Sequence, residues 1–404
     1  MARATRAGNP GGESDGEALE RRVGRLEFSE GAFVRLRVPL RVNAEAGRDV
    51  LTDLDVLSID VDPRLRVSNA IIECKSGSGQ AGEPDRLLWL AGVRDYVRAD
   101  RAMLIRSTVS TRGRLVASRL RLETMDLPRL EEREQGIVWM PDTFAHIGAP
   151  LCASAERDTD TAVTTLALPS DLVSFVRGDF VFQPARTLRS VVDLWATLDG
   201  SAVPDRPRMM LASHSLVALI HAALIDSKAL DVMPRSTLSD RLERQLTVGT
   251  EQSNLLEILE QADALVGLTI DRIHEAYERT GLSRQAVAVP RLRDVVAEPP
   301  NWLPRYLDLV EAFRANGSVA ADLLQTAELA CFDGLLGGDA YAHEAFDQLF
   351  TIEHRQLLRL ARASLSEIAG TSASESLEGF ESLNFQRRPS TPDRRSAPRL
   401  SQPL

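Results

Sequence analysis

Hydrophobic and polar positions follow two different periods along the first third of the chain. Residues 17–30 repeat apolar side chains at helical spacing, whereas residues 32–42 alternate apolar and polar side chains as a half-buried strand does. Two strands, a helix, a strand, a helix, a strand and a helix are expected next, at 50–61, 67–75, 84–97, 102–106, 113–120, 121–126 and 127–134. This mixture predicts an α/β domain over residues 16–136.

The second half of the chain has a helical pattern throughout. Segments between about 169 and 368 repeat apolar side chains at helical spacing, without the fixed repeat length of a solenoid. We therefore expect an all-helical domain over residues 159–370, joined to the first domain by a linker at 137–158. The two ends, 1–15 and 371–404, are poor in apolar residues and predict a flexible leader and a disordered tail rich in Ser, Pro and Arg.

Charge separates the same two halves. The formal charge of the chain is −10. Residues 151–370 carry eleven more acidic than basic side chains, whereas residues 1–150 are balanced. Because the acidic block would repel a duplex, contact with nucleic acid is expected in the first domain or the tail. A protein partner for the helical domain and a homodimer both stay open.

Cysteine usage and hydropathy restrict the location of the protein. Cys74, Cys152 and Cys331 are far apart and have neither metal-binding spacing nor the density of a disulfide scaffold, which predicts a reducing cytoplasm. The longest apolar stretch, residues 211–225, has 15 residues, fewer than the roughly 20 that a membrane-spanning helix needs. No membrane contact is therefore expected.

Lysine is rare in this chain. Lys and Arg together number 48, and only Lys75 and Lys228 are lysine. An ammonium is a compact charge, whereas a guanidinium is a planar fork. A lysine in such a background indicates a role that arginine cannot fill.

Two acidic residues accompany Lys75 at the ends of predicted strands. Glu73 and Lys75 are two residues apart and project from one face of their strand, while Cys74 points to the other face. Asp55 lies on the preceding strand, so strand pairing would bring two carboxylates and one ammonium together. Carboxylate oxygens suit Mg²⁺, which can activate a water molecule beside a phosphate.

The segments Leu54-Asp55-Val56-Leu57 and Ile71-Ile72-Glu73-Cys74-Lys75 resemble the signature of the PD-(D/E)xK, or restriction-endonuclease-like, nucleases. Leu54 stands where the motif has its proline. Over about residues 16–125, this resemblance implies an α-β-α core with a mixed central sheet. It also implies DNA as the substrate, Mg²⁺ or Mn²⁺ held by Asp55, Glu73 and the carbonyl of Cys74, and a catalytic Lys75.

A further similarity lies upstream of these strands. Glu20-Arg21, Leu26, Gly31, Phe33 and Arg35 look like the first helix and strand of the Holliday-junction resolvases and Mrr-like nucleases. In those families a glutamate on that helix joins the metal site, and the resemblance assigns this role to Glu20. DNA repair and defence against foreign DNA both fit such an enzyme.

Other interpretations stay open on the residues alone. The nuclease fold can be an inactive scaffold whose helical half binds nucleic acid or protein. Asp60 and Asp62 fit a turn, and the arginines at 112, 114, 119 and 121 fit either phosphate contacts or a solvated face. His343 and His354 are weak candidates for a metal site, and Ser213-His214-Ser215 is interpreted as core.

Overall fold

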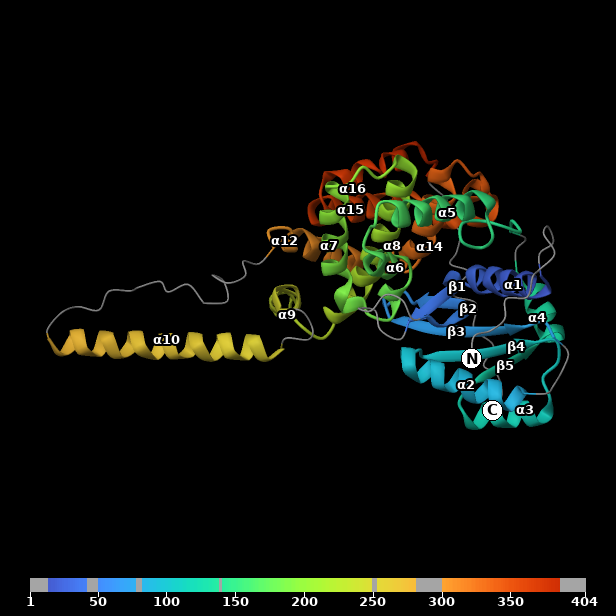
Figure 1. Ribbon diagram of the computed structural model, residues 1–404, viewed down its shortest axis with the longest axis horizontal. Helices are drawn as coiled ribbons and strands as arrows, with labels where there is room; N and C mark the ends of the chain where they lie inside the picture. The colour runs from blue at the N-terminus through green and yellow to red at the C-terminus, as the bar shows by residue number, and fades with distance from the viewer. Residues whose placement is uncertain are drawn as a thin grey trace.

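The computed structural model describes residues 14–41, 50–77, 82–137, 140–248, 253–280 and 300–385. Among these residues, strands and helices alternate in the first part and only helices follow in the second, so the predicted change from α/β to helical structure is confirmed (Figure 1). The elements of the first part are α1 (Asp15–Ser29), β1 (Phe33–Arg41), β2 (Val50–Val61), β3 (Val67–Lys75), α2 (Glu83–Val97), β4 (Arg101–Arg106), α3 (Thr111–Arg119), β5 (Glu123–Asp126) and α4 (Leu127–Glu134).

The sheet is mixed, and its five strands lie in the order β1-β2-β3-β4-β5. β2 is antiparallel to both β1 and β3, whereas β3, β4 and β5 are parallel. The antiparallel strands need only short connections, while each parallel step is made through a helix, α2 or α3. The predicted strands therefore pair in sequence order, and the ends of β2 and β3 that carry acidic residues meet.

Helices cover both faces of the sheet (Figure 1). α1 lies over one face, where the Ser58 hydroxyl of β2 donates to the Glu27 carboxylate at 3.0 Å. α2 and α3 lie over the opposite face, toward which Glu73 of β3 projects to meet Arg86 of α2. α1 starts at a capping box, in which the Ser14 hydroxyl accepts from the Glu17 amide and the Glu17 side chain accepts from the Ser14 amide.

The helical part is built around α8 (Asp205–Ala229), with seven other described α-helices packed on it. By length and composition α8 could cross a membrane, but 89% of its most apolar window is buried inside the protein, as in the core helix of a soluble protein. The other helices are α5 (Pro150–Thr165), α6 (Ser170–Arg177), α7 (Thr187–Asp199), α9 (Arg235–Val248), α10 (Ser253–Arg279), α12 (Leu303–Ala315), α13 (Gly317–Ala320), α14 (Leu323–Phe332), α15 (Ile352–Ala369) and α16 (Thr371–Glu375).

The predicted linker at 137–158 is wrong in its second half, because α5 begins at Pro150 and buries Cys152 and Ala155. Before it, the Phe144 ring lies 4.9 Å from Phe28 and 5.0 Å from Phe346, so this segment packs between the two halves. The sequence also predicted two domains held together by that linker. One continuous apolar core joins them instead.

Both predicted ends need correction where the structure describes them. Residues 371–385, expected in the disordered tail, contain α16 and a short 3₁₀ turn, Glu378–Ser382. The reason is the apolar set Leu377, Phe380 and Leu383, which is buried against the helical part. At the other end Asp15, placed in the leader, already belongs to α1. Residues 1–13 and 386–404 lie outside the described residues.

Candidate functional site

The register of β2 and β3 places Asp55 opposite Glu73. Val56 pairs with Ile72 and Leu57 with Ile71, so the next step of the antiparallel ladder reaches Asp55 and Glu73. Side chains opposite one another in such a pair project from the same face. Lys75 follows Glu73 by two residues and shares that face. The structure thus brings together the three residues on which the sequence prediction depends.

Direct contacts join these three side chains. The Lys75 ammonium lies 2.5 Å from Oε1 of Glu73 and 3.5 Å from Oδ2 of Asp55. One nitrogen therefore links both carboxylates as a shared counter-ion. The backbone amide of Cys74 donates to the same Asp55 oxygen at 2.8 Å. This hydrogen bond fixes the aspartate against the end of β3.

Cys74 offers only its backbone to this site. Its side chain is buried and lies on the opposite face of the strand. Burial, together with the negative charges of Asp55, Glu20 and Glu73, raises the pKa of the Cys74 thiol well above its usual value. The thiol therefore stays protonated, which leaves the carbonyl oxygen as the group that could join Asp55 and Glu73 around a divalent cation.

Glu20 approaches Asp55 from α1. Its side chain is 12% exposed, and Oε2 accepts from Nε of Arg37 at 2.8 Å. Burial raises the pKa of Glu20, and the charge of Asp55 raises it further, while Arg37 acts in the opposite direction. The other glutamates of α1 point elsewhere: Glu27 binds Ser58, and Glu30 binds Arg133. Glu20 is the one whose pKa the charge of Asp55 raises, and its place in a metal site stays a prediction.

The sheet is locally irregular beside Asp55. The pairing of β1 with β2 passes from Leu36–Val56 to Val38–Leu54 and skips Arg37 and Asp55. Arg37 has a φ of 55°, in the left-handed region that non-glycine residues rarely adopt. Such strained backbone costs of order 1–3 kcal/mol and tends to occur at functional sites. Here it directs the Arg37 side chain to Glu20.

Sequence reasoning missed Arg86 on α2. Its Nη2 contacts Oε1 of Glu73, and its guanidinium carbon lies 3.9 Å from the centre of the Trp89 ring. Arg86 and Trp89 are three residues apart, so they share a face of the helix. The sequence feature that could have indicated it is an arginine on the helix that directly follows the strand of Lys75. With it, a cation contacts each of Glu20, Asp55 and Glu73, and Arg37 is shared between Glu20 and Glu17.

The weaker sequence candidates do not build a second site at this end of the molecule. Asp62 accepts from the amides of Arg64 and Arg66 at 2.8 and 3.0 Å, as expected of a turn. Arg114 pairs with Asp126 at 2.5 Å. The rings of His343 and His354 contact the Ala345 amide and the Thr351 hydroxyl near their own helix starts. The possible metal site at these histidines gains no support.

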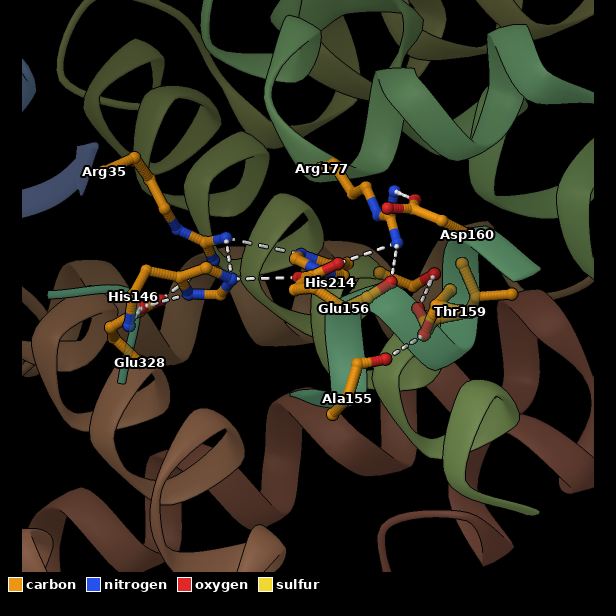
Figure 2. Close-up of polar contacts among 11 residues, drawn as sticks. Arg35, His146, Ala155, Glu156, Thr159, Asp160, Arg177, His214 and Glu328 are labelled. Carbon is orange, nitrogen blue, oxygen red and sulfur yellow. Dashed lines mark hydrogen bonds and ion pairs between the residues drawn. The ribbon is translucent and has the colours of Figure 1, made fainter. Parts of the chain in front are cut away.

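A second cluster of polar side chains lies between β1 and the helices (Figure 2). Oε1 of Glu156 is 2.9 Å from Nε2 of His146 and 2.6 Å from Nε2 of His214, and all three atoms lie within 4.8 Å of one another. Glu328 contacts the other nitrogen of His146 at 2.5 Å. Two histidine nitrogens and a carboxylate suit Zn²⁺ rather than Mg²⁺.

Two arginines already balance this cluster. Nη1 of Arg35 is 3.1 Å from Nε2 of His146, and Arg177 lies 2.7 Å from the second Glu156 oxygen. Burial lowers the pKa of His214 to about 4, so this ring is neutral and can donate to Glu156 while accepting from Arg35. A metal ion would sit beside the Arg35 guanidinium. The arrangement therefore favours a network of ion pairs over a metal site.

No pattern in the sequence indicates this network. Its members come from β1, from the segment before α5, and from α5, α6, α8 and α14, with no characteristic spacing. His214 was assigned to the core, and it is buried there, but with polar partners.

Comparison with known proteins found no relative of this chain. No family model, no curated protein and no solved structure matches it. The functional assignment rests on the residues and their geometry.

Proposed function

We propose that this chain is a metal-dependent nuclease of the restriction-endonuclease-like class that hydrolyses DNA phosphodiester bonds. The observation that carries the proposal is the convergence of Asp55, Glu73 and Lys75 at one end of a mixed sheet with helices on both faces. A location in the cytoplasm belongs to the same proposal, supported by three buried free cysteines.

The donor set fits a hard divalent cation. The carboxylates of Asp55 and Glu73, with the carbonyl of Cys74, would hold Mg²⁺ or Mn²⁺, and Glu20, whose pKa the charge of Asp55 raises, would assist them. When bound, such an ion supplies Lewis-acid activation of water and charge neutralisation at a phosphate. Three oxygen donors leave room for the waters that Mg²⁺ retains.

Lys75 and the surrounding residues account for the rest of the proposed chemistry. The Lys75 ammonium is 35% exposed and lies between the two carboxylates, where it can orient an attacking water and offset charge on the scissile phosphate. DNA would approach the balanced first part of the chain, because the acidic helical part repels a duplex. The helical part would then restrict access or bind a protein partner.

The alternative is an inactive scaffold that binds nucleic acid or protein. The feature that favours it is the complete pairing of the site, since each of Glu20, Asp55 and Glu73 already contacts a cation. A cation that cannot be displaced would exclude metal from the site. Nuclease and scaffold therefore differ in whether Mn²⁺ binds at these carboxylates.

One assay tests the nuclease directly. Purified full-length protein is incubated with plasmid and with labelled oligonucleotides in Mg²⁺ or Mn²⁺, and Lys75→Ala is compared with Lys228→Ala. We expect metal-dependent cleavage that Lys75→Ala abolishes and Lys228→Ala retains, because Lys228 only pairs with Asp231 at a helix end. Equal activity of the two variants would refute the assignment of the site.

A further inference from the structure

Arg86 is an additional cation on a carboxylate that already has one. The Lys75 ammonium and the Arg86 guanidinium contact the same Glu73 oxygen, and the Glu73 side chain is 2% exposed. Lys75 also reaches Asp55, so it alone links both carboxylates. Arg86 makes no such bridge within the described part of the chain. Of the two cations it is the one that can leave without separating Asp55 from Glu73.

The charge balance of the site explains why one of the two cations should leave Glu73 when a metal ion binds. The three cations face four carboxylates, because Arg37 pairs with Glu17 as well as with Glu20, so the site carries a net formal charge of −1. A divalent cation added to this set would leave an excess of positive charge in a partly buried place, which is unfavourable. A phosphodiester brings negative charge. If Arg86 moves from Glu73 to that phosphate, the carboxylate becomes available and the guanidinium keeps an anionic partner.

The neighbouring tryptophan gives the displaced guanidinium a place to remain. Arg86 stacks on Trp89 at 3.9 Å, and the indole packs against the core, so this contact does not depend on Glu73. Arg86 is 31% exposed and belongs to α2, whereas Lys75 belongs to β3 itself. Rotation of the Arg86 side chain therefore leaves the strand that carries Glu73 undisturbed.

We propose that Arg86 occupies the position of the divalent cation at Glu73 and, when that cation binds, becomes a phosphate-binding residue for the DNA strand. This inference rests on the proposed nuclease function. In this proposal Arg86 contacts Glu73 in the metal-free site and a DNA phosphate in the metal-bound site. Arg86 competes with the cation and contacts DNA. A variant that lacks the guanidinium should therefore bind the cation more tightly and DNA more weakly.

The first measurement is binding of Mn²⁺ by titration calorimetry, with no DNA present. Arg86→Met should bind Mn²⁺ more tightly than the wild type, on the order of tenfold, because a charge-assisted contact no longer competes. The matched control is Arg129→Met, which removes an arginine that pairs with Glu132 on the exposed face of α4. This control should leave Mn²⁺ affinity unchanged. Unchanged or weaker Mn²⁺ binding by Arg86→Met would overturn the inference.

The second measurement is binding of a duplex oligonucleotide with phosphorothioate linkages, with and without Mn²⁺. Arg86→Met should weaken DNA binding roughly tenfold when Mn²⁺ is present and little when it is absent. An equal loss under both conditions would overturn the inference, because Arg86 would then be an ordinary surface charge. Neither measurement uses cleavage. An inactive wild type would refute the nuclease while these two results still decided the role of Arg86.

Discussion

Arg35 of β1 and Glu328 of α14 form a buried ion pair, with 2.8 Å between Nη2 and Oε2 and at most 5% exposure of either side chain. The rings of Phe33 and Phe332 lie 5.1 and 4.7 Å from the guanidinium carbon. A charge on the sheet thus meets its partner on the helical part inside an aromatic enclosure. Since the amide of Gln325 also donates to the Phe28 carbonyl at 2.7 Å, the two parts should unfold together.

Breaking this pair should destabilise the whole protein. Arg35→Met leaves Glu328 charged in a buried site, which typically costs about 3–5 kcal/mol of the free energy of unfolding. The double variant Arg35→Met/Glu328→Met removes both charges and should recover a large part of that loss. Urea unfolding followed by circular dichroism measures Arg35→Met, Glu328→Met and the double variant. A double variant as unstable as the sum of its single variants would show that the pair is not coupled.

Lys75→Arg should be nearly as damaging to cleavage as Lys75→Ala. The ammonium fits between two carboxylate oxygens at 2.5 and 3.5 Å, whereas a guanidinium is larger and fixes its donors in a plane. Loss of one preorganised charge at a reacting centre lowers the rate on the order of 10²–10³-fold. Lys228→Arg is the control and should be neutral. A thermal melt verifies that each variant is folded. A folded and active Lys75→Arg would contradict the catalytic role assigned to Lys75.

Glu20→Gln should slow cleavage by an order of magnitude or more while leaving Asp55 and Glu73 in place. The substitution keeps the shape of the side chain but removes the charge that Arg37 and Asp55 both sense. Glu30→Gln is the matched control on the same helix, because Glu30 is 43% exposed and contacts Arg133. Initial rates with saturating Mg²⁺ measure the effect. Equal rates for the two variants would assign Glu20 a structural role only.

The sequence was sufficient to predict that Asp55, Glu73 and Lys75 converge, because their convergence depends on strand periodicity. Asp55, Glu73 and Lys75 lie on neighbouring strands joined by a short turn, so alternation and one ladder register bring them together. Arg86 comes from the next helix. Its distance from Glu73 depends on how α2 packs against the sheet, which a one-dimensional pattern does not contain.

The network around Arg35 could not be predicted from the sequence, because it too depends on how helices pack against the sheet. Its residues are separated by up to 293 positions and meet only because α5, α8 and α14 pack onto β1. The apolar residues Phe144 and Phe380 were equally misjudged, because each lies in a segment with no regular period. Loops and short turns bury such side chains through tertiary contacts, and so a linker and a tail were predicted where the chain is packed.

His221 should make the protein less stable in mild acid. Its ring is fully buried, lies 5.3 Å from Phe180, and has no hydrogen-bond partner within the described part of the chain. Burial lowers the pKa of His221 from 6.5 to about 4. The unfolded chain therefore takes up a proton near pH 6.5, whereas the folded protein resists protonation until about pH 4. The stabilising contribution is complete above pH 6.5 and is lost as the pH falls toward 4.

Replacing this ring isolates its share of the acid sensitivity. Between pH 7.5 and pH 5, one such histidine costs about 2 kcal/mol of the free energy of unfolding. His221→Leu should lose that much less than the wild type over this range in urea unfolding. Ala212→Gly, a change in the same helix that does not titrate, should cost about 1 kcal/mol at both pH values and keep the wild-type difference. If His221→Leu loses as much stability in acid as the wild type does, the responsible protons bind elsewhere, with His214 and His354, whose pKa values burial also lowers to about 4, as the next residues to replace.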